Sequence, residues 1–192
     1  MLMLRRSVDP EWAPRVTRSL GDLLVDHAHL ERKAATTAIQ LEKYRELFPK
    51  VHALNQIAIE ELQHFEMVHD RIKERGSVLG RERRDDYVWE LNQFIRKGHE
   101  RHIVLVDQLL FSALVEARSC ERFKVLSENI SDPSLREFYR ELMISEAGHY
   151  TMFLGFARKY ANGIDVEARW QEFLAYEDQV IRRYGKKETI HG

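Results

Sequence analysis

Apolar residues recur along this chain at intervals of three and four positions, the spacing that places side chains on one face of an α-helix. The segment that begins at Leu20 illustrates the pattern, with further apolar residues at Leu23, Leu24, Leu30 and Ala34. No strand-like alternation of β-branched residues extends over six positions. The sequence therefore predicts an all-α protein.

Helix-breaking residues divide this pattern into segments. No proline occurs between Pro49 and Pro133. Asp9 before Pro10, and Asp132 before Pro133, have the arrangement of an N-cap followed by proline in the first turn. Glycines mark several expected helix ends, at positions 76, 80, 98, 163 and 185. The expected helices cover about residues 16–47, 50–75, 84–97, 99–129, 133–161 and 165–184, after a short N-terminal segment.

Long helices joined by short loops favour an antiparallel four-helix bundle. We expect one domain over residues 1–192. It consists of a first helical hairpin at about 16–75, a crossover with a short helix at 76–98, a second hairpin at about 99–161 and a C-terminal helix at about 165–184. A length of 192 residues with 44% apolar content is sufficient to bury a substantial core.

Charge and cysteine content narrow the range of functions. The 30 Lys+Arg and 31 Asp+Glu residues give a net charge of −1, which provides no global reason to expect nucleic acid or an anionic membrane as partner. A single cysteine, Cys120, excludes an intramolecular disulfide framework and Cys-rich zinc or iron–sulfur sites. The first ten residues contain no apolar signal region, and the most apolar stretch, 103–115, is too short to span a bilayer. We expect a cytoplasmic protein.

Polar residues repeat along the chain at an interval of 85 positions. Under this shift the segment Ile59–Met67 falls on Ile144–Met152. Apolar matches alone mean little between amphipathic helices, but here polar residues also coincide, so both expected hairpins carry them in the same register. The coinciding pairs are Glu31 with Glu116, Glu61 with Glu146, and His64 with His149.

The spacing of these residues predicts that they lie at one level of the bundle. Glu31 and Glu61 are 30 residues apart, as are Glu116 and Glu146, and the midpoint of each pair falls beside an expected turn, at 47–49 and 131–133. Residues equidistant from the turn of an antiparallel hairpin lie level with each other, here about 22 Å from it. Each Glu-x-x-His motif also places its carboxylate and imidazole on the same helix face.

Four carboxylates cannot all stay ionised in an apolar interior without compensation. Two divalent cations supply that compensation, and four glutamates with two histidines form the ligand set of di-metal carboxylate sites in four-helix bundles. Oxygen and imidazole ligands without sulfur favour iron or manganese, with coordination positions left open for O₂. The chain has no Cys-x-x-Cys pairs and no glycine-rich flavin or dinucleotide motif, so electrons must come from a separate reductant.

Other polar residues near the motifs have ordinary explanations. Glu66 and His69 form a further Glu-x-x-His but have no counterpart in the repeat, so we expect them at the surface. His27 is expected to be a core histidine with a satisfied hydrogen bond rather than a group that faces the site, and Cys120 is expected to be packed in the core. Two basic clusters are solvated helix ends or substrate contacts: Arg81, Arg83 and Arg84 in the crossover, and Arg182, Arg183, Lys186 and Lys187 near the C-terminus.

Three segments around the motifs read HAHLERKAA at 27–35, EELQHF at 60–65 and EAGHY at 146–150. With these segments the chain resembles the MiaE family of the ferritin-like superfamily over about residues 8–185. Members of that family are bacterial tRNA hydroxylases that act on 2-methylthio-N6-isopentenyl-adenosine at position 37, beside the anticodon. The resemblance implies a ferritin-like four-helix bundle, made of two repeated antiparallel hairpins with extra short helices.

The resemblance also implies a non-haem di-iron monooxygenase that uses O₂ and two external electrons to hydroxylate the isopentenyl group. It implies a tRNA anticodon loop and an electron-donor reductase as partners, with no DNA and no membrane. The two basic clusters then become candidate tRNA contacts. The implied ligands of two iron ions, and hence the catalytic residues, are Glu31, Glu61, His64, Glu116, Glu146 and His149.

Two other ferritin-like activities remain as alternatives. A demethoxyubiquinone-type hydroxylase acts at a membrane and favours an exposed apolar or basic amphipathic helix, for which residues 165–184 give no strong indication. A ferroxidase or iron-storage protein is disfavoured by the second Glu-x-x-His motif, which ferritins generally lack.

Overall fold

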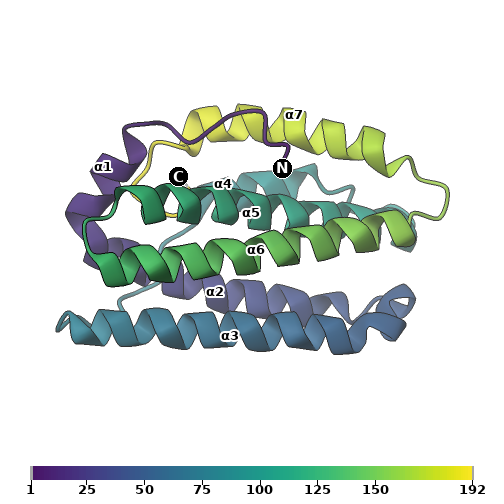
Figure 1. The fold of residues 1–192 in the computed structure, drawn as a ribbon. Helices are drawn as coiled ribbons and strands as arrows, with labels where there is room; N and C mark the ends of the chain where they lie inside the picture. The colour runs from purple at the N-terminus through teal and green to yellow at the C-terminus, as the bar shows by residue number, and fades with distance from the viewer. Residues whose placement is uncertain (1, 192) are drawn as a thin grey trace. The chain divides into compact units, whose positions relative to one another are not determined.

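The computed structural model describes residues 2–191, and within them the regular secondary structure is entirely helical (Figure 1). Met1 and Gly192, which belong to the expected domain of residues 1–192, lie outside the described residues. The chain divides into two compact units, which we call the small unit (residues 16–84) and the large unit (residues 1–15 and 85–192). Among the described residues, no helix combines the length and apolar character that crossing a bilayer requires.

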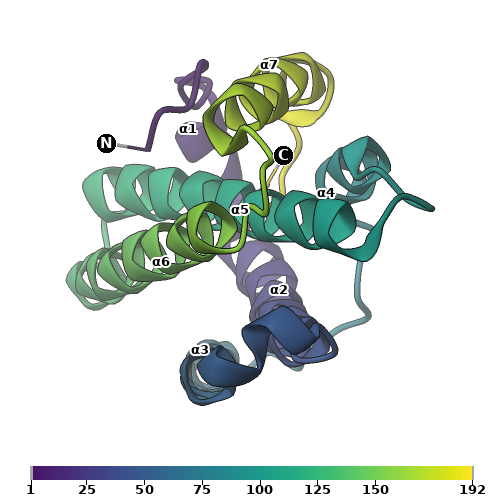
Figure 2. The same ribbon diagram turned by 90° about the vertical axis from the view of Figure 1, so that its right-hand side faces the viewer.

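The small unit is a helical hairpin. After a 3₁₀ turn, η1 (Thr17–Ser19), helix α2 (Leu20–Leu41) and helix α3 (Val51–Glu74) run side by side (Figures 1 and 2). Each helix buries one apolar face, and Leu24, Ala28 and Leu54 are among its fully buried residues. The amphipathic spacing seen in the sequence therefore produces the expected pair of helices.

The turn of this hairpin differs from the expected helix over 16–47. Helix α2 ends at Leu41, and a 3₁₀ segment, η2 (Arg45–Lys50), leads into α3. Tyr44 has an extended backbone, and both Tyr44 and Leu47 are buried. Burial of the Tyr44 and Leu47 side chains thus competes with continuation of α2 as a helix. Pro49 also lacks the backbone N–H that an α-helix would need at this position.

Helix α3 ends where glycine allows it. Gly76 has a φ of +67°, which a side chain with a Cβ disfavours. The backbone N–H of Ser77 donates to Ile72 O at 3.1 Å, and that of Gly76 donates to Lys73 O at 2.8 Å. This is the Schellman arrangement that satisfies the last carbonyls of a helix. The segment from Gly76 to Arg84 follows without regular structure.

The large unit contains the second hairpin, made of α5 (Arg101–Asn129) and α6 (Pro133–Lys159), which lie side by side (Figures 1 and 2). Helix α7 (Val166–Tyr184) packs against both α5 and the short helix α4 (Asp86–Leu91). Asp132 accepts hydrogen bonds from the backbone N–H groups of Ser134 and Leu135, which confirms the predicted N-cap of α6. The short helix α1 (Trp12–Val16) leads from the large unit into the small one.

The expected helix over 84–97 is interrupted by a long-range contact. Helix α4 continues only into a 3₁₀ turn, η3 (Asn92–Phe94), and Ile95 is extended. The backbone N–H of Arg96 then donates to Oδ2 of the buried Asp107 at 2.9 Å instead of to a helical carbonyl. A hydrogen bond to a charged acceptor is stronger than one to a neutral carbonyl, so the chain leaves the helix here.

Candidate metal centre

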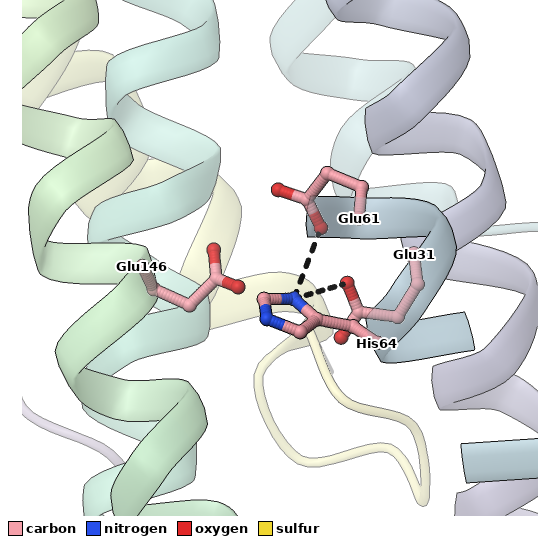
Figure 3. A group of neighbouring side chains, drawn as sticks. All are labelled: Glu31, Glu61, His64 and Glu146. Atoms are coloured by element: carbon pink, nitrogen blue, oxygen red, sulfur yellow. Dashed lines mark ion pairs between the residues drawn. The ribbon is translucent and has the colours of Figure 1, made fainter. Parts of the chain in front are cut away.

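Three candidate ligands meet inside the small unit. Glu31 on α2 and Glu61 and His64 on α3 are all buried, and one donor atom from each lies within 4.8 Å of the others. His64 Nδ1 is 3.8 Å from Glu31 Oε2 and 3.5 Å from Glu61 Oε2, and Figure 3 shows the three side chains pointing toward one another. We call these residues the first triad.

The helical register explains why the first triad forms. Glu61 and His64 are three residues apart on α3, so they share one face. Glu31 lies on the antiparallel helix α2, and the midpoint between Glu31 and Glu61 falls within the turn that joins Leu41 to Val51. The two carboxylates are therefore level with each other.

The first triad needs positive charge. Burial disfavours the ionised form of Glu31, but His27 and His64 outweigh it and hold the pKa of Glu31 well below its ordinary value. Burial also disfavours a charged His64, but its interactions with the carboxylates of Glu31 and Glu61, which favour the protonated imidazole, outweigh it and raise the pKa of His64 to about 10. A bound cation would take over this role, after His64 loses its proton to coordinate it.

The large unit carries the equivalent set, which we call the second triad. Glu116 on α5 and Glu146 and His149 on α6 are buried, with exposed fractions of 6%, 2% and 2%. One donor atom from each lies within 4.8 Å of the others. His149 Nδ1 is 3.9 Å from Glu146 Oε2. The sequence repeat at 85 residues therefore corresponds to a similar cluster of two glutamates and one histidine in each unit.

The donor chemistry of each triad fits a divalent metal such as iron. Each triad contains two carboxylates and one imidazole, so with neutral histidine its charge of −2 balances one divalent cation. Buried carboxylates that lack such a partner are expensive to ionise. Oxygen and nitrogen donors without sulfur are the ligands that iron and manganese accept in proteins.

His27 lies closer to the candidate site than the sequence suggested. It is fully buried, as expected of a core histidine, but its hydrogen-bond partner is the candidate ligand Glu31. His27 Nε2 lies 2.5 Å from Glu31 Oε1. The four-residue interval between the two was the available signal, because it places both side chains on one face of α2.

Other residues near the motifs lie where ordinary packing places them. Glu66 is exposed, and His69 stacks on Phe65 with ring centroids 5.9 Å apart. The buried thiol of Cys120 donates to Met143 O at 3.3 Å, and burial raises its pKa to about 11. Neither the additional Glu-x-x-His nor the cysteine belongs to a triad.

Two of the crossover arginines line a surface pocket of the small unit. Arg81 and Arg83 share this pocket of about 560 Å³ with Asp22 and Val25 of α2. Arg83 donates to Asp22 O at 3.2 Å, and nearly half of its side chain is exposed. Arg84 is exposed on the same segment. The pocket that Arg81 and Arg83 line therefore lies beside α2, the helix that carries Glu31, and its described lining includes no residue of the first triad.

The C-terminal basic residues are paired with acidic ones in the large unit. Arg182 donates to Asp178 at 2.8 Å, and Arg183 lies 3.4 Å from Glu90. Lys187 pairs with an aspartate of α4. Arg182 lines a second pocket, of about 670 Å³, together with residues of the N-terminal segment 5–10.

The chain is similar to known proteins over both of its units. A protein of Pseudomonas putida named tRNA 2-(methylsulfanyl)-N(6)-isopentenyladenosine(37) hydroxylase is 36% identical over 94% of this chain and 87% of its own length. A protein of the same name from Salmonella typhimurium is 34% identical over 69% of this chain, which corresponds to 47% of that protein.

A solved structure from Synechococcus, described as protein 43 with aldehyde deformylating oxygenase activity, superposes with a TM-score of 0.89. It has 32% identity, over 98% of this chain and 95% of that one. This likeness confirms the prediction of an all-α, ferritin-like fold. The family model described as tRNA-(MS[2]IO[6]A)-hydroxylase (MiaE) matches residues 1–192. This chain belongs to the MiaE family.

Proposed function

We propose that this protein hydroxylates the isopentenyl group of 2-methylthio-N6-isopentenyl-adenosine at position 37 of tRNA, at a di-iron centre held by the two triads. The observation that carries the proposal is the pair of buried Glu, Glu, His triads, repeated at 85 residues in a chain of the MiaE family. The identity of the substrate is taken from the names of the two relatives. None of the three proteins compared above is named as a quinone hydroxylase or a ferritin.

The proposal includes one ferritin-like domain that binds two iron ions through the ligands of both triads. The first triad contributes Glu31, Glu61 and His64, and the second contributes its equivalents. Four carboxylates and two neutral imidazoles balance two ferrous ions. The iron centre, when bound, supplies O₂ activation, in which one oxygen atom enters a C–H bond of the substrate and the other leaves as water, with two electrons from an external reductase.

The chain's own residues hold the metal and shape the surroundings of the reacting group. Ile57 and Val68 are buried on the α3 face that carries Glu61, and Leu142 and Phe153 are buried on the corresponding face of α6. Such apolar walls suit a prenyl chain and exclude water, which would otherwise consume the oxidant. An isopentenyl group has no polar atom, so shape and hydrophobicity must select it.

For the tRNA itself, we propose that the pocket at Arg81 and Arg83 contacts the anticodon loop. Its wall at Asp22 lies nine residues before Glu31 on α2, or about 13 Å along the helix axis. Arginines at this distance can hold backbone phosphates while the modified base is displaced from its stack. The C-terminal cluster is less suited because its arginines lie closer to acidic side chains: Arg182 is 2.8 Å from Asp178 and Arg183 is 3.4 Å from Glu90, whereas Arg83 is 3.9 Å from Asp26. Such a tRNA hydroxylase acts in the cytoplasm.

The test is a single turnover of the reduced, iron-loaded protein with O₂ and isopentenylated, methylthiolated tRNA, followed by mass spectrometry of the nucleosides. The expected product gains one oxygen atom in the isopentenyl group. A matched reaction with a Glu146→Ala variant, which lacks one ligand of the second triad, should give none. Two bound irons without a hydroxylated nucleoside would overturn the proposal. If the reduced protein instead hydroxylated a demethoxyquinone or deformylated an aldehyde, that activity would replace the proposal.

A further inference from the structure

The two triads share their ligand types but differ in what supports the glutamate contributed by the first helix of each hairpin. In the small unit, His27 lies one turn before Glu31, and its Nε2 contacts Glu31 Oε1 at 2.5 Å. Under the 85-residue shift, the residue one turn before Glu116 is Ser112. The repeat therefore breaks at the residue that contacts the ligand.

The two carboxylate oxygens of Glu31 have different neighbours, because one of them contacts His27. Because an ionised carboxylate only accepts hydrogen bonds, His27 Nε2–H is the donor and Oε1 the acceptor. The other oxygen, Oε2, is the atom that lies 3.8 Å from His64 Nδ1. Glu31 is thus held with one oxygen occupied and the other directed toward the remaining donors of its triad.

Ser112 cannot do the same for Glu116. It is 3% exposed, and its hydroxyl oxygen has no hydrogen-bond partner among residues 2–191. A serine side chain is also much shorter than that of histidine. The second triad therefore has a carboxylate whose orientation is less constrained by its own helix.

We infer that the metal positions of the two triads are inequivalent. The first triad is preorganised by His27 and binds a divalent cation more tightly, so the centre fills sequentially. This inference rests on the proposed function. A donor that fixes a ligating group typically contributes 10- to 100-fold in metal affinity. His27 is in this sense a positioning residue, and Glu116 is the carboxylate left able to change its orientation.

The inference is tested by titrating the metal-free full-length chain with Co²⁺ without O₂, using calorimetry and the visible d–d spectrum of bound cobalt. The wild type should show two binding events per chain whose affinities differ by at least about 10-fold. Glu31→Ala should remove the tighter event and Glu116→Ala the weaker one. These two variants identify which triad fills first.

His27→Ala should lower the affinity of the tighter event by about 10- to 100-fold, so that the two events merge. His27→Gln, which retains an N–H donor, should recover part of the difference. Ser112→Ala is the matched control at the equivalent position and should leave both events unchanged. Far-ultraviolet circular dichroism of each metal-free variant establishes that it is folded.

The outcomes separate this inference from the proposed function. Two equal affinities in the wild type, or a His27→Ala variant that keeps its tight event, would overturn the inequivalence while leaving a di-metal protein. Loss of the tight event in Glu116→Ala rather than in Glu31→Ala would reverse the assignment and refute it. If no metal binds to either triad, the di-iron function itself is wrong.

Discussion

Replacing Asp107 by asparagine should destabilise the large unit by about 3 kcal/mol. Asp107 is fully buried and accepts hydrogen bonds from two arginines: Arg96, through its backbone N–H and its guanidinium, and Arg169, through its guanidinium, at 2.8–3.0 Å. The Asp107→Asn variant keeps the size of the side chain but removes its charge and turns one acceptor into a donor. Both guanidinium groups then face an amide.

The magnitude follows from how deeply each arginine is buried. Removing one partner of a buried ion pair typically costs about 3–5 kcal/mol. The side chain of Arg96 is 32% exposed and can be rehydrated, whereas that of Arg169 is 9% exposed. Arg169 also keeps a contact with Glu172 at 2.7 Å. The lower end of the range is therefore appropriate, about 3 kcal/mol, which corresponds to a loss of about 6–12 °C in Tm for a chain of this size.

The assay is thermal and urea unfolding followed by circular dichroism, with Glu172→Gln as the matched control. Glu172 pairs with the same Arg169, but its side chain is 59% exposed, so its replacement should cost less than about 1 kcal/mol. An Asp107→Asn variant within about 0.5 kcal/mol of wild type would refute the reasoning, because it would mean that the ion pairs contribute no more than surface pairs.

The stability difference between wild type and the Asp107→Asn variant should depend on pH. Burial disfavours ionisation of Asp107, but the hydrogen bonds from Arg96 and Arg169 outweigh it and lower its pKa. Its contribution to stability is therefore present above the unfolded pKa of about 3.9 and is lost as the pH falls through the folded value. The difference in unfolding free energy between wild type and Asp107→Asn should stay constant above about pH 5 and narrow below about pH 4.

Three further predictions concern the candidate site and its surroundings. Glu116→Ala removes a carboxylate of the second triad, so elemental analysis should find fewer than two irons per chain, and two irons would contradict the ligand assignment. Arg81→Ala combined with Arg83→Ala should weaken tRNA binding about 10-fold near 0.1 M salt and reduce the salt slope by about 2, with iron content intact. The control Arg140→Ala, which replaces an exposed arginine of α6, should change neither the affinity nor the salt slope. The thiol of Cys120 should react with a disulfide reagent only on unfolding, because burial raises its pKa to about 11, and fast labelling of the folded protein would contradict its packing role.

The helices were predictable because local sequence determines them. The amphipathic period, the Asp132 cap and the glycine after α3 each act within a few residues, so their effect can be inferred without the fold. The ends of helices were less predictable where a distant residue competes for the backbone. The N–H of Arg96 is bound by Asp107, eleven positions later, and that carboxylate is held in turn by Arg169 on another helix. Nothing in the local pattern around Arg96 indicates this competition.

The candidate ligands were predictable for a different reason. Identical polar residues at an 85-residue interval show which positions both hairpins need, and the structure brings the three residues of each set together within its own unit. The same comparison, used only for identities, could not reveal the contact between His27 and Glu31, because position 112 carries serine. In a duplicated metal-binding hairpin, shared residues indicate the ligands, whereas the differences indicate where the two metal positions diverge. The buried contact between His27 and Glu31 is such a difference, since only the structure shows that this core histidine contacts a candidate ligand.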